Sequence, residues 1–262
     1  MRWLQLSVRR LVKKINIKTE EEMKVMADGG KKLARVKNAL AKAVRPGASA
    51  WDIEELANKL IEKEGAQASF KKVPGYKWAT CVNVNDGVVH GIPKKSTIFK
   101  DGDVVSVDVG VYYKGFHTDT AVSVCLGKDR EKKDFLAAGK KAMLAGVAQV
   151  KKGKKIGDIS AGIEKQLLAN DLRPIWVLTG HGVGRDLHEE PNISCYVNND
   201  PVSGLVIGTG FVLAVEVMFT KGNGEIKQDA DGWTLRTKDG KIAGLFEETV
   251  AVTADGPVVL TV

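Results

Sequence analysis

Two aspartates interrupt a stretch of the chain that otherwise has the pattern of a β-sheet. Residues 101–124 read DGDVVSVDVGVYYKGFHTDTAVSV. In the first half, valines at every second position alternate with small or polar residues that include Asp108, which predicts a strand with one apolar face. The second half alternates in the same way and includes Asp119. Because Lys114-Gly115 between the halves suits a tight turn, we expect a β-hairpin.

A two-residue turn also predicts which residues of the hairpin face one another. Asp108 would face Ala121 and Asp119 would face Gly110. Both carboxylates then lie on one face as diagonal neighbours, roughly 7–8 Å apart at the backbone. Two like charges on a shielded face repel and lose hydration, so one must stay protonated or a cation must neutralise both. The alternative is a solvated hairpin face, which needs no cation.

The second half of the chain supplies more groups that bind metals. In the motif TGHGVGRDLHEEP, glycines bracket His181 and leave its imidazole uncrowded, and His188 follows in the same motif. Two apolar runs, FVLAVEVMF and GLFEETVAVT, contain Glu216 and Glu247 respectively. A carboxylate inside such a strand is unfavourable unless it is paired or bound to a metal. For either glutamate alone, we expect a salt bridge.

Jointly, these groups predict a metal site. Hard oxygen ligands with a single nitrogen suit divalent ions such as Mn²⁺, Fe²⁺, Co²⁺ or Zn²⁺, and not a closed thiolate zinc site. Two ions about 3.5–4 Å apart would bridge a water, lower its pKa and polarise a carbonyl group, which is hydrolytic chemistry. The predicted ligands are Asp108, Asp119, His181, Glu216 and Glu247.

Helix capping patterns and apolar periodicity predict the elements that position these residues. Residues 66–100 read as irregular chain with short strands, and helices and hairpins follow one another without regular β-α-β alternation. This order favours an α+β fold with a largely antiparallel sheet. Predicted helices cover residues 19–44, from the capping box Thr19–Glu22; 49–65, from Ser49 and Asp52; 129–150; and 158–169, opened by Asp158.

Composition limits the class of protein. The chain has 262 residues, of which 44% are hydrophobic, and no apolar run is long enough to span a membrane. Its three cysteines, Cys81, Cys125 and Cys195, are odd in number and lack zinc-type spacing. This favours free thiols and therefore the cytoplasm.

The net charge of +8 indicates contact with polyanions and says nothing about the fold. Part of it is local, in residues 1–14 and in the run VKKGKK at 150–155. Residues 1–15 are expected to form a poorly ordered basic extension, with a surface-binding amphipathic segment as the alternative. Residues 16–262 are expected to form a single catalytic domain.

The motifs in their order along the chain resemble those of the bacterial-type (type I) methionine aminopeptidases. They are NDGVVHGIP, GDVVSVDVGVYYKGFHTDT, GHGVGRDLHEEP, VEVMF, DGWTLRTKDGKIAG and FEET, within a match from about Ile17 to the end. The first contains His90, which on its own reads as a structural or solvated loop histidine. The resemblance implies the duplicated "pita-bread" α+β fold and removal of the initiator methionine from nascent chains.

The resemblance also implies a role for each matched residue. Asp108 would bind one ion through both oxygens, and Asp119 and Glu247 would bridge two ions. His181 would bind the second ion, and Glu216 would be both a ligand and the group that handles the proton of the attacking water. The remaining roles are hydrogen bonds to substrate and transition state from His90 and His188, and a methionine pocket formed by Cys81, Tyr76, Trp233 and Leu187.

The chain departs from the family pattern at four positions. Val217 follows Glu216 where the family usually has proline, and Glu248 stands where it usually has histidine. Val73 and Leu187 replace residues that are commonly aromatic. All predicted metal ligands are kept, so the departures bear on rate and pocket shape more than on the reaction.

Three related types of protein are the alternatives. Proline-specific aminopeptidases and prolidases carry an extra N-terminal domain, for which the segment before Asp108 is too short. Eukaryotic-type methionine aminopeptidases insert a subdomain between His181 and Glu216, and the gap here is short. A non-catalytic relative that binds ribosomes or nucleic acid would typically have lost ligands. We therefore expect a monomeric enzyme that acts on the N-terminal methionine of nascent polypeptides and docks weakly on ribosomal RNA through basic residues.

Overall fold

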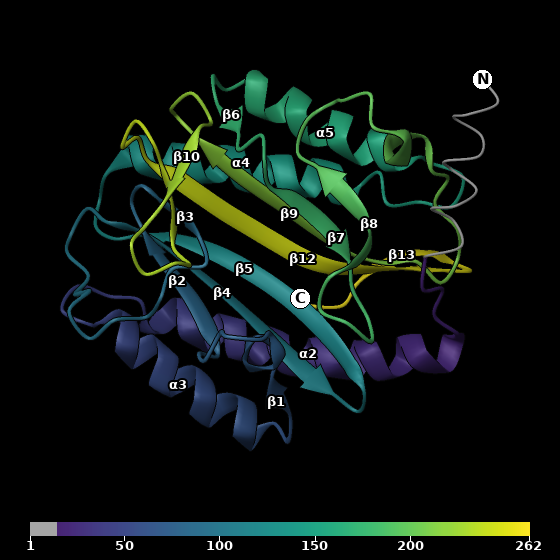
Figure 1. Ribbon diagram of the computed structural model, residues 1–262, viewed down its shortest axis with the longest axis horizontal. Coiled ribbons are helices and arrows are strands. Elements are labelled where there is room, and N and C mark those ends of the chain that lie inside the picture. The colour runs from purple at the N-terminus through teal and green to yellow at the C-terminus, as the bar shows by residue number, and fades with distance from the viewer. Residues whose placement is uncertain (1–14) are drawn as a thin grey trace.

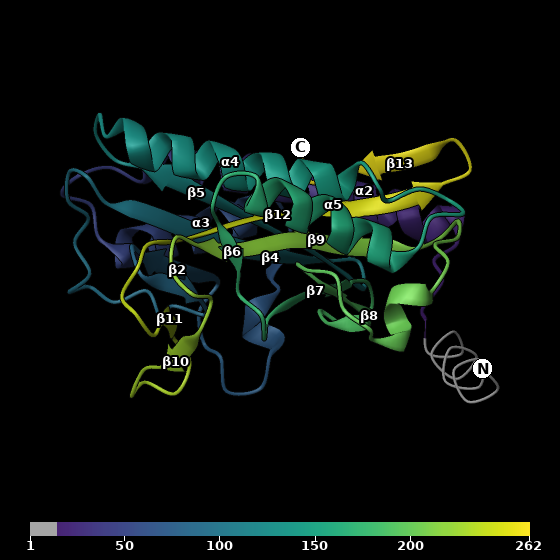
Figure 2. The same cartoon turned by 90° about the horizontal axis from the view of Figure 1, so that it is seen from above.

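The structure is a computed structural model that describes residues 15–262. The predicted basic extension lies outside this range except for Ile15. One long antiparallel sheet runs through the protein, with α4 (Arg130–Val147) and α5 (Ile156–Leu168) on one side and the β10–β11 region on the other (Figure 2). Figure 1 shows a second helix pair, α2 (Glu20–Ala43) and α3 (Ala50–Lys63), beside the other half of the sheet.

The helix boundaries agree with the predicted caps. The Thr19 side chain accepts a hydrogen bond from the Glu22 amide at the start of α2, and Ser49 and Asp52 form the corresponding box at α3. Two boundaries were predicted wrongly. Helix α4 ends at Val147 and not at residue 150. Helix α5 begins at Ile156, because Asp158 caps it from the third helical position by accepting a hydrogen bond from the Lys155 amide at 2.8 Å.

The central hairpin has the predicted register. Strands β4 (Val104–Tyr113) and β5 (Phe116–Cys125) are antiparallel, and their turn is Lys114-Gly115, with both residues at positive φ. Asp108 pairs with Ala121, and Asp119 pairs with Gly110. The alternation that defined the two faces therefore places both aspartates on the same face of the sheet.

The other strands extend this hairpin on both sides. The main path of the sheet is β1-β4-β5-β12-β9-β7-β8, so the two glutamate strands lie side by side in the middle. Short strands β10, β11 and β3 form a small separate sheet. The bounds are β1 Gln67–Ala68, β2 Thr80–Val84, β3 Gly87–Val89, β6 Arg173–Pro174, β7 Thr179–Gly182, β8 Glu189–Ser194, β9 Val212–Thr220, β10 Ile226–Gln228, β11 Leu235–Thr237, β12 Ala243–Thr253 and β13 Gly256–Val259.

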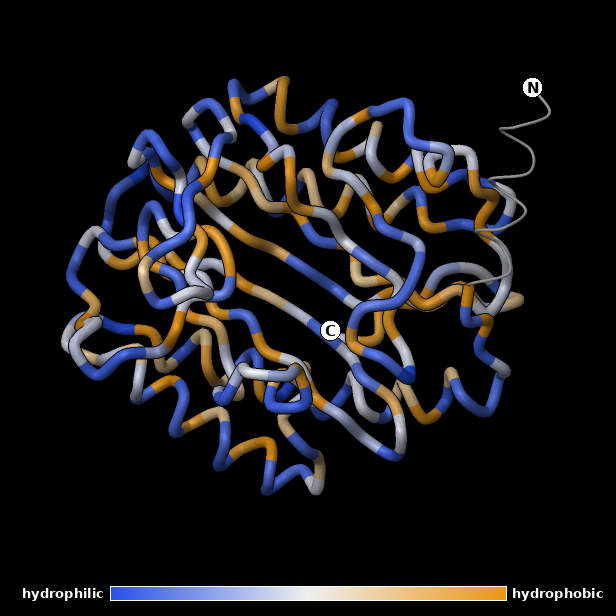
Figure 3. Tube along the Cα trace, in the orientation of Figure 1, coloured by the Kyte–Doolittle hydropathy of each residue, from blue (hydrophilic) through white to orange (hydrophobic). Residues whose placement is uncertain are grey.

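Two apolar cores hold the helices to the sheet. Val105, Val107, Val109 and Val111 of β4 pack with residues of α2 and α3, and the second core joins α4 and α5 to β9 and β12. Figure 3 shows the resulting alternation of hydrophobic and hydrophilic residues along the helices. At the second core, Gly139 of α4 is needed because a Cβ atom there would overlap the ring of Phe219. No helix in residues 15–262 is long and apolar enough to cross a membrane.

Candidate metal centre

Strand register brings the five predicted ligands to one place. Asp108, Ala121, Glu247 and Glu216 form a row across β4, β5, β12 and β9, because each pairs with the next. Asp119 lies two residues from Ala121 on the same face of β5. His181 of β7 pairs with Ala214, two residues from Glu216 on β9. The sheet therefore collects side chains that are far apart in sequence.

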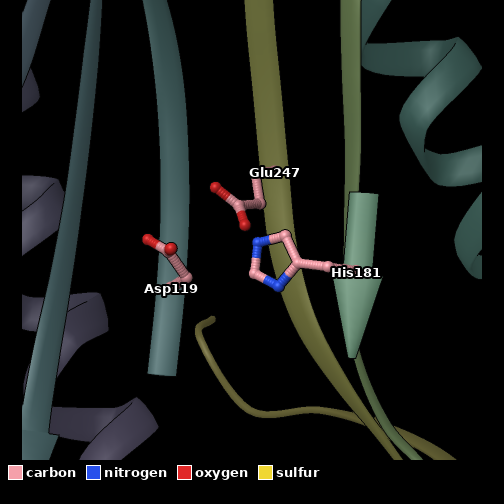
Figure 4. A group of neighbouring side chains, drawn as sticks. All are labelled: Asp119, His181 and Glu247. Carbon is pink, nitrogen blue, oxygen red and sulfur yellow. The ribbon is translucent and has the colours of Figure 1, made fainter. Parts of the chain in front are cut away.

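Three of these residues form the tightest group. One ligand atom from each of Asp119, His181 and Glu247 lies within 4.8 Å of the others, and all three side chains are buried (Figure 4). Glu216 adjoins them, with its Oε1 atom 3.7 Å from His181 Nε2. Asp108 completes the set by lining the same cavity.

The buried oxygens of this group fit a cation. Within residues 15–262, Asp108 Oδ1 and Glu247 Oε1 are buried and have no hydrogen-bond partner. Such an atom has lost its water without a replacement, which is unfavourable unless a positive ion contacts it. Carboxylate oxygens with one imidazole nitrogen are the donor set of Mn²⁺, Fe²⁺, Co²⁺ or Zn²⁺.

The pKa values show how strongly the protein alone opposes charge here. Burial raises the pKa of Asp108 to about 7, and burial together with neighbouring carboxylates raises the pKa of Asp119 and Glu247 well above the usual range. Burial likewise raises the pKa of Glu216, with Asp108 as a second cause. Burial lowers the pKa of His181 to about 3, so its imidazole is neutral and free to bind a metal.

The expectation of a salt bridge for either glutamate alone is wrong. In the described chain, no lysine or arginine nitrogen lies within 4.0 Å of Glu216 or Glu247. Instead the two glutamates pair with each other across β9 and β12. A pair of facing carboxylates without a basic partner is a further reason to assign them to a cation.

His90 and His188 stand at the same cavity as the predicted ligands. The His188 ring is 4.5 Å from that of His181, and both His90 and His188 have their pKa lowered by desolvation. His90 has φ +58°, in the left-handed region. The next residue, Gly91, donates its amide hydrogen to Asn83 Oδ1 at 3.0 Å, which holds the turn.

An apolar pocket forms the other end of the cavity, whose volume is about 320 Å³. Tyr76, Cys81, Leu187 and Phe70 are buried in one cluster, and Trp233 packs against it. The Tyr76 and Trp233 rings meet edge to face at 5.1 Å. Tyr76 Oη donates to Thr80 O at 2.9 Å and also contacts Cys81 Sγ at 3.2 Å, so its polar end is satisfied within the pocket wall.

Sequence reasoning missed two residues that support this pocket. Phe70 lines it from the short 3₁₀ helix Phe70–Lys72, in a stretch expected to be irregular. Glu54 of α3 is 3% exposed and accepts hydrogen bonds from the amides of Ala79 and Thr80, beside Cys81. The one available signal was a glutamate among the apolar positions of an amphipathic helix.

The departures from the family pattern have local explanations. Val217 is buried in the second core, on the opposite face of β9 from Glu216. Glu248 is paired with Lys37 of α2, at 2.6 Å between Oε1 and Nζ. Leu187 and Val73 both line the apolar pocket. All four departures lie outside the predicted ligand set: three are in packed apolar surroundings, and Glu248 has Lys37 as its counter-charge.

The sequence matches the model of metallopeptidase family M24 over residues 24–254. The chain belongs to this family. It is 39% identical to the methionine aminopeptidase of Aquifex aeolicus, over 94% of this chain and 98% of that protein, and 37% identical to methionine aminopeptidase 1 of Bacillus subtilis, over 93% and 98%. The crystal structure of methionine aminopeptidase from Thermotoga maritima superposes with a TM-score of 0.91 at 38% identity, covering 94% of this chain and 99% of that one.

Membership of family M24 confirms the resemblance found in the sequence motifs. The fold shared with the Thermotoga maritima structure also confirms the predicted α+β pita-bread architecture. An M24 protein is a metallopeptidase, and the group of Asp119, His181 and Glu247 is where the described chain can hold a metal.

Proposed function

We propose that this M24 peptidase removes the N-terminal initiator methionine from nascent proteins whose second residue is small. The observation that carries the proposal is the composition of one cavity. Asp108, Asp119, His181, Glu216 and Glu247 line one part of it, and an apolar cluster lines the adjoining part. A peptide amino terminus can therefore lie at the metal-binding group while an apolar side chain fills the neighbouring pocket.

We propose that two divalent ions are held by Asp108, Asp119, His181, Glu216 and Glu247. Two buried carboxylate oxygens without a hydrogen-bond partner, together with four carboxylates in one cavity, support more than one positive ion. When bound, the ions would supply an activated water and a polarised carbonyl group. Co²⁺, Mn²⁺, Fe²⁺ and Zn²⁺ all suit this donor set, and availability selects among them.

The protein's own groups then have separate tasks. Glu216 would bind an ion and take up the proton of the attacking water. His90 and His188 are neutral because desolvation lowers the pKa of each ring, so each offers one N–H donor and one acceptor to the peptide. The pocket of Tyr76, Cys81, Leu187 and Trp233 would hold the methionine side chain and so align the first peptide bond with the cluster.

One assay tests this function. The metal-loaded protein should hydrolyse Met-Gly and Met-Ala peptides and leave Met-Leu and Met-Lys almost intact, because we propose a confined site for the second residue. Equal rates on all four peptides would contradict the specificity. No cleavage of any would favour the non-catalytic alternative, a ribosome- or nucleic-acid-binding relative with the same fold.

We further propose weak docking on ribosomal RNA through the loop between α4 and α5. Lys151, Lys152, Lys154 and Lys155 are all exposed there, in a chain with a net charge of +8. Contacts with phosphates should weaken steeply as salt increases. Co-sedimentation with ribosomes at low salt should be lost when the four lysines are replaced by glutamine. Binding that is absent at low salt or unchanged in the variant would contradict this.

We propose that residues 16–262 act as one catalytic domain, as a monomer in the cytoplasm. The three cysteines are free and Cys81 and Cys195 are buried, which suits a reducing compartment. Light scattering during size-exclusion chromatography measures the oligomeric state directly.

A further inference from the structure

A buried ion pair joins the segment that enters α2 to the first residue of β8, which follows the loop from β7. Lys18 Nζ lies 2.5 Å from Glu189 Oε2, and the two side chains are 4% and 2% exposed. Lys18 directly precedes Thr19, the N-cap of α2, while Glu189 directly follows His188. The pair therefore connects a helix start with the residue that follows one of the two cavity histidines.

Lys18 is held at its backbone and at the tip of its side chain. Its backbone amide donates to Gly210 O at 2.9 Å. Its tip passes Gly184 so closely that a Cβ atom on Gly184 would lie 2.6 Å from Lys18 Nζ and 2.8 Å from Glu189 Oε1. Only a residue without a side chain fits there, so the loop and the lysine are packed around each other.

The second oxygen of Glu189 closes the turn that carries two cavity residues. Glu189 Oε1 accepts a hydrogen bond from the Asp186 amide at 3.2 Å. Leu187 and His188 lie between these two residues, and both line the cavity. Lys18 holds one oxygen of the Glu189 carboxylate, and the other oxygen holds the turn. The carboxylate can therefore determine where the Leu187 and His188 side chains point.

Stability alone is a poor explanation for this ion pair. A buried pair loses so much hydration that apolar residues of similar volume are often as good or better. Desolvation indeed lowers the pKa of Lys18, although Glu189 opposes that shift. A buried pair does fix orientation, because each charge must stay in contact with the other.

We propose that Lys18 and Glu189 are positioning residues that set the place of His188 and Leu187 in the cavity. Lys18 orients the Glu189 carboxylate, and the carboxylate holds the 186–189 turn. The segment before α2 thus sets the position of His188 through Glu189. We call the contact from Lys18 through Glu189 to the 186–189 turn the brace, and it is a property of the fold. Its effect on catalysis rests on the proposed aminopeptidase function.

A double-variant cycle on the metal-loaded protein tests the proposal with Met-Ala peptide. Lys18→Met leaves the Glu189 carboxylate buried without its counter-charge, so the turn should shift. We expect kcat to fall by up to about 100-fold, the loss that a displacement of about 1 Å can cause, with a smaller rise in KM. Glu189→Gln keeps an acceptor for the Asp186 amide, and we expect a loss of about tenfold. The double variant should lose no more than Glu189→Gln alone, because its glutamine needs no counter-charge.

Hydrogen exchange supplies a readout that does not depend on activity. In metal-free protein, the Asp186 amide should exchange faster in Lys18→Met than in the wild type. The matched control is Arg35→Met, which breaks another α2 ion pair, with Glu64 at 2.5 Å, on an exposed face of the helix. The control should keep both kcat and the exchange rate of Asp186.

Several outcomes would overturn the proposal. The first is that Lys18→Met changes neither kcat nor the exchange rate of the Asp186 amide. The second is that the kcat losses of the two single variants multiply in the double variant. The third is that kcat falls only in proportion to the fraction of protein that is folded or metal-bound. If Lys18→Met does not fold, the double variant decides: a kcat near that of Glu189→Gln supports the brace, and a much lower kcat contradicts it. A wild type that fails to cleave Met-Ala would refute the proposed function, while hydrogen exchange would still test the brace.

Discussion

The two ends of the cavity are built in different ways. The predicted metal ligands lie on five neighbouring strands, where the hydrogen-bond ladder fixes their spacing. The apolar pocket comes mostly from loops and short elements whose rings pack against one another, such as Tyr76 with Trp233, although Cys81 lies on β2 and pairs with Asp108. A ladder cannot slip by one residue without turning every side chain to the other face, whereas packed rings tolerate substitution. Two of the four departures from the family pattern, Val73 and Leu187, accordingly lie at the pocket end.

The two ends also differ in energy. The pocket end, formed by Phe70, Tyr76, Cys81, Leu187 and Trp233, is lined mainly by apolar and aromatic side chains. The other end, where the predicted metal ligands lie on the hydrogen-bonded strands, is called the ladder end. It gathers four carboxylates, and burial raises the pKa of each of them. Substitutions at the ladder end should therefore abolish metal binding and activity together, and substitutions at the pocket end should change substrate binding with the metal retained.

The largest effect is expected from Asp119→Asn at the ladder end. The change removes a negative charge between two proposed cations, so occupancy should fall and activity should drop by more than about 100-fold, since changes to groups that only support ligands already cost about 10–100-fold. Metal analysis beside steady-state kinetics measures both. Asp171→Asn is the control, because Asp171 is exposed and its φ of +54° suits asparagine. Full activity with full metal content in Asp119→Asn would refute the assignment.

A loss of activity without metal release is expected from His90→Ala. If His90 hydrogen-bonds mainly the transition state, kcat should fall by about 10²–10³-fold, or roughly 3–4 kcal/mol. Metal content and fold should stay intact, because His90 lies in a loop outside the ligand set. Loss of metal from His90→Ala would show that the histidine belongs to the ladder end after all.

Removing the metal should make stability depend on pH. The raised pKa values mean that the folded metal-free protein keeps protons that the unfolded chain has released. Its stability should therefore fall as pH rises from about 4 through the raised pKa of Asp108, about 7. The decrease should be on the order of a few kcal/mol.

The comparison that isolates this effect is the difference in melting temperature between metal-free and metal-loaded protein. Other titrating groups contribute equally to both forms, so the difference should widen from pH 5 to pH 8, because over this range the unfolded chain has released protons that the buried carboxylates of the folded metal-free form retain. A constant difference would mean that the carboxylates are not the cause.

The mildest effect is expected at the pocket end, from Trp233→Ala. Trp233 packs against the apolar cluster and is half-buried, so its loss opens the pocket without disturbing the strands. We expect KM for Met-Ala to rise by about tenfold with kcat nearly kept, since the lost contact serves substrate and transition state alike. Kinetics with metal analysis checks this. A fall in metal content would contradict the separation of the two ends.

The sequence predicted those parts of the fold and site that depend on local chain geometry. The Lys114-Gly115 turn determined the register of Asp108 and Asp119, and capping boxes located two helix starts. The facing of Glu216 and Glu247 was not foreseen, because it depends on pairing between strands that are distant in sequence. For the same reason each glutamate alone suggested a salt bridge.

Residues that act through tertiary contacts gave the weakest signals. Glu54 could be read as one more solvent-facing glutamate of a helix, although it holds the amides of Ala79 and Thr80. Lys18 likewise stood among the polar residues before a helix, and only its contact with Glu189 shows its burial. Periodicity shows which face a residue occupies, but the partner on another element comes from the folded chain.

Glu248 has an evolutionary consequence. Its carboxylate accepts hydrogen bonds from the Thr120 and Thr261 hydroxyls and is 2.6 Å from Lys37 Nζ, directly after the proposed ligand Glu247. A change from the histidine usual in the family to glutamate would add a negative charge beside a cluster that is already crowded with them. Lys37 offsets that charge, so selection should oppose the loss of Lys37 wherever Glu248 is kept.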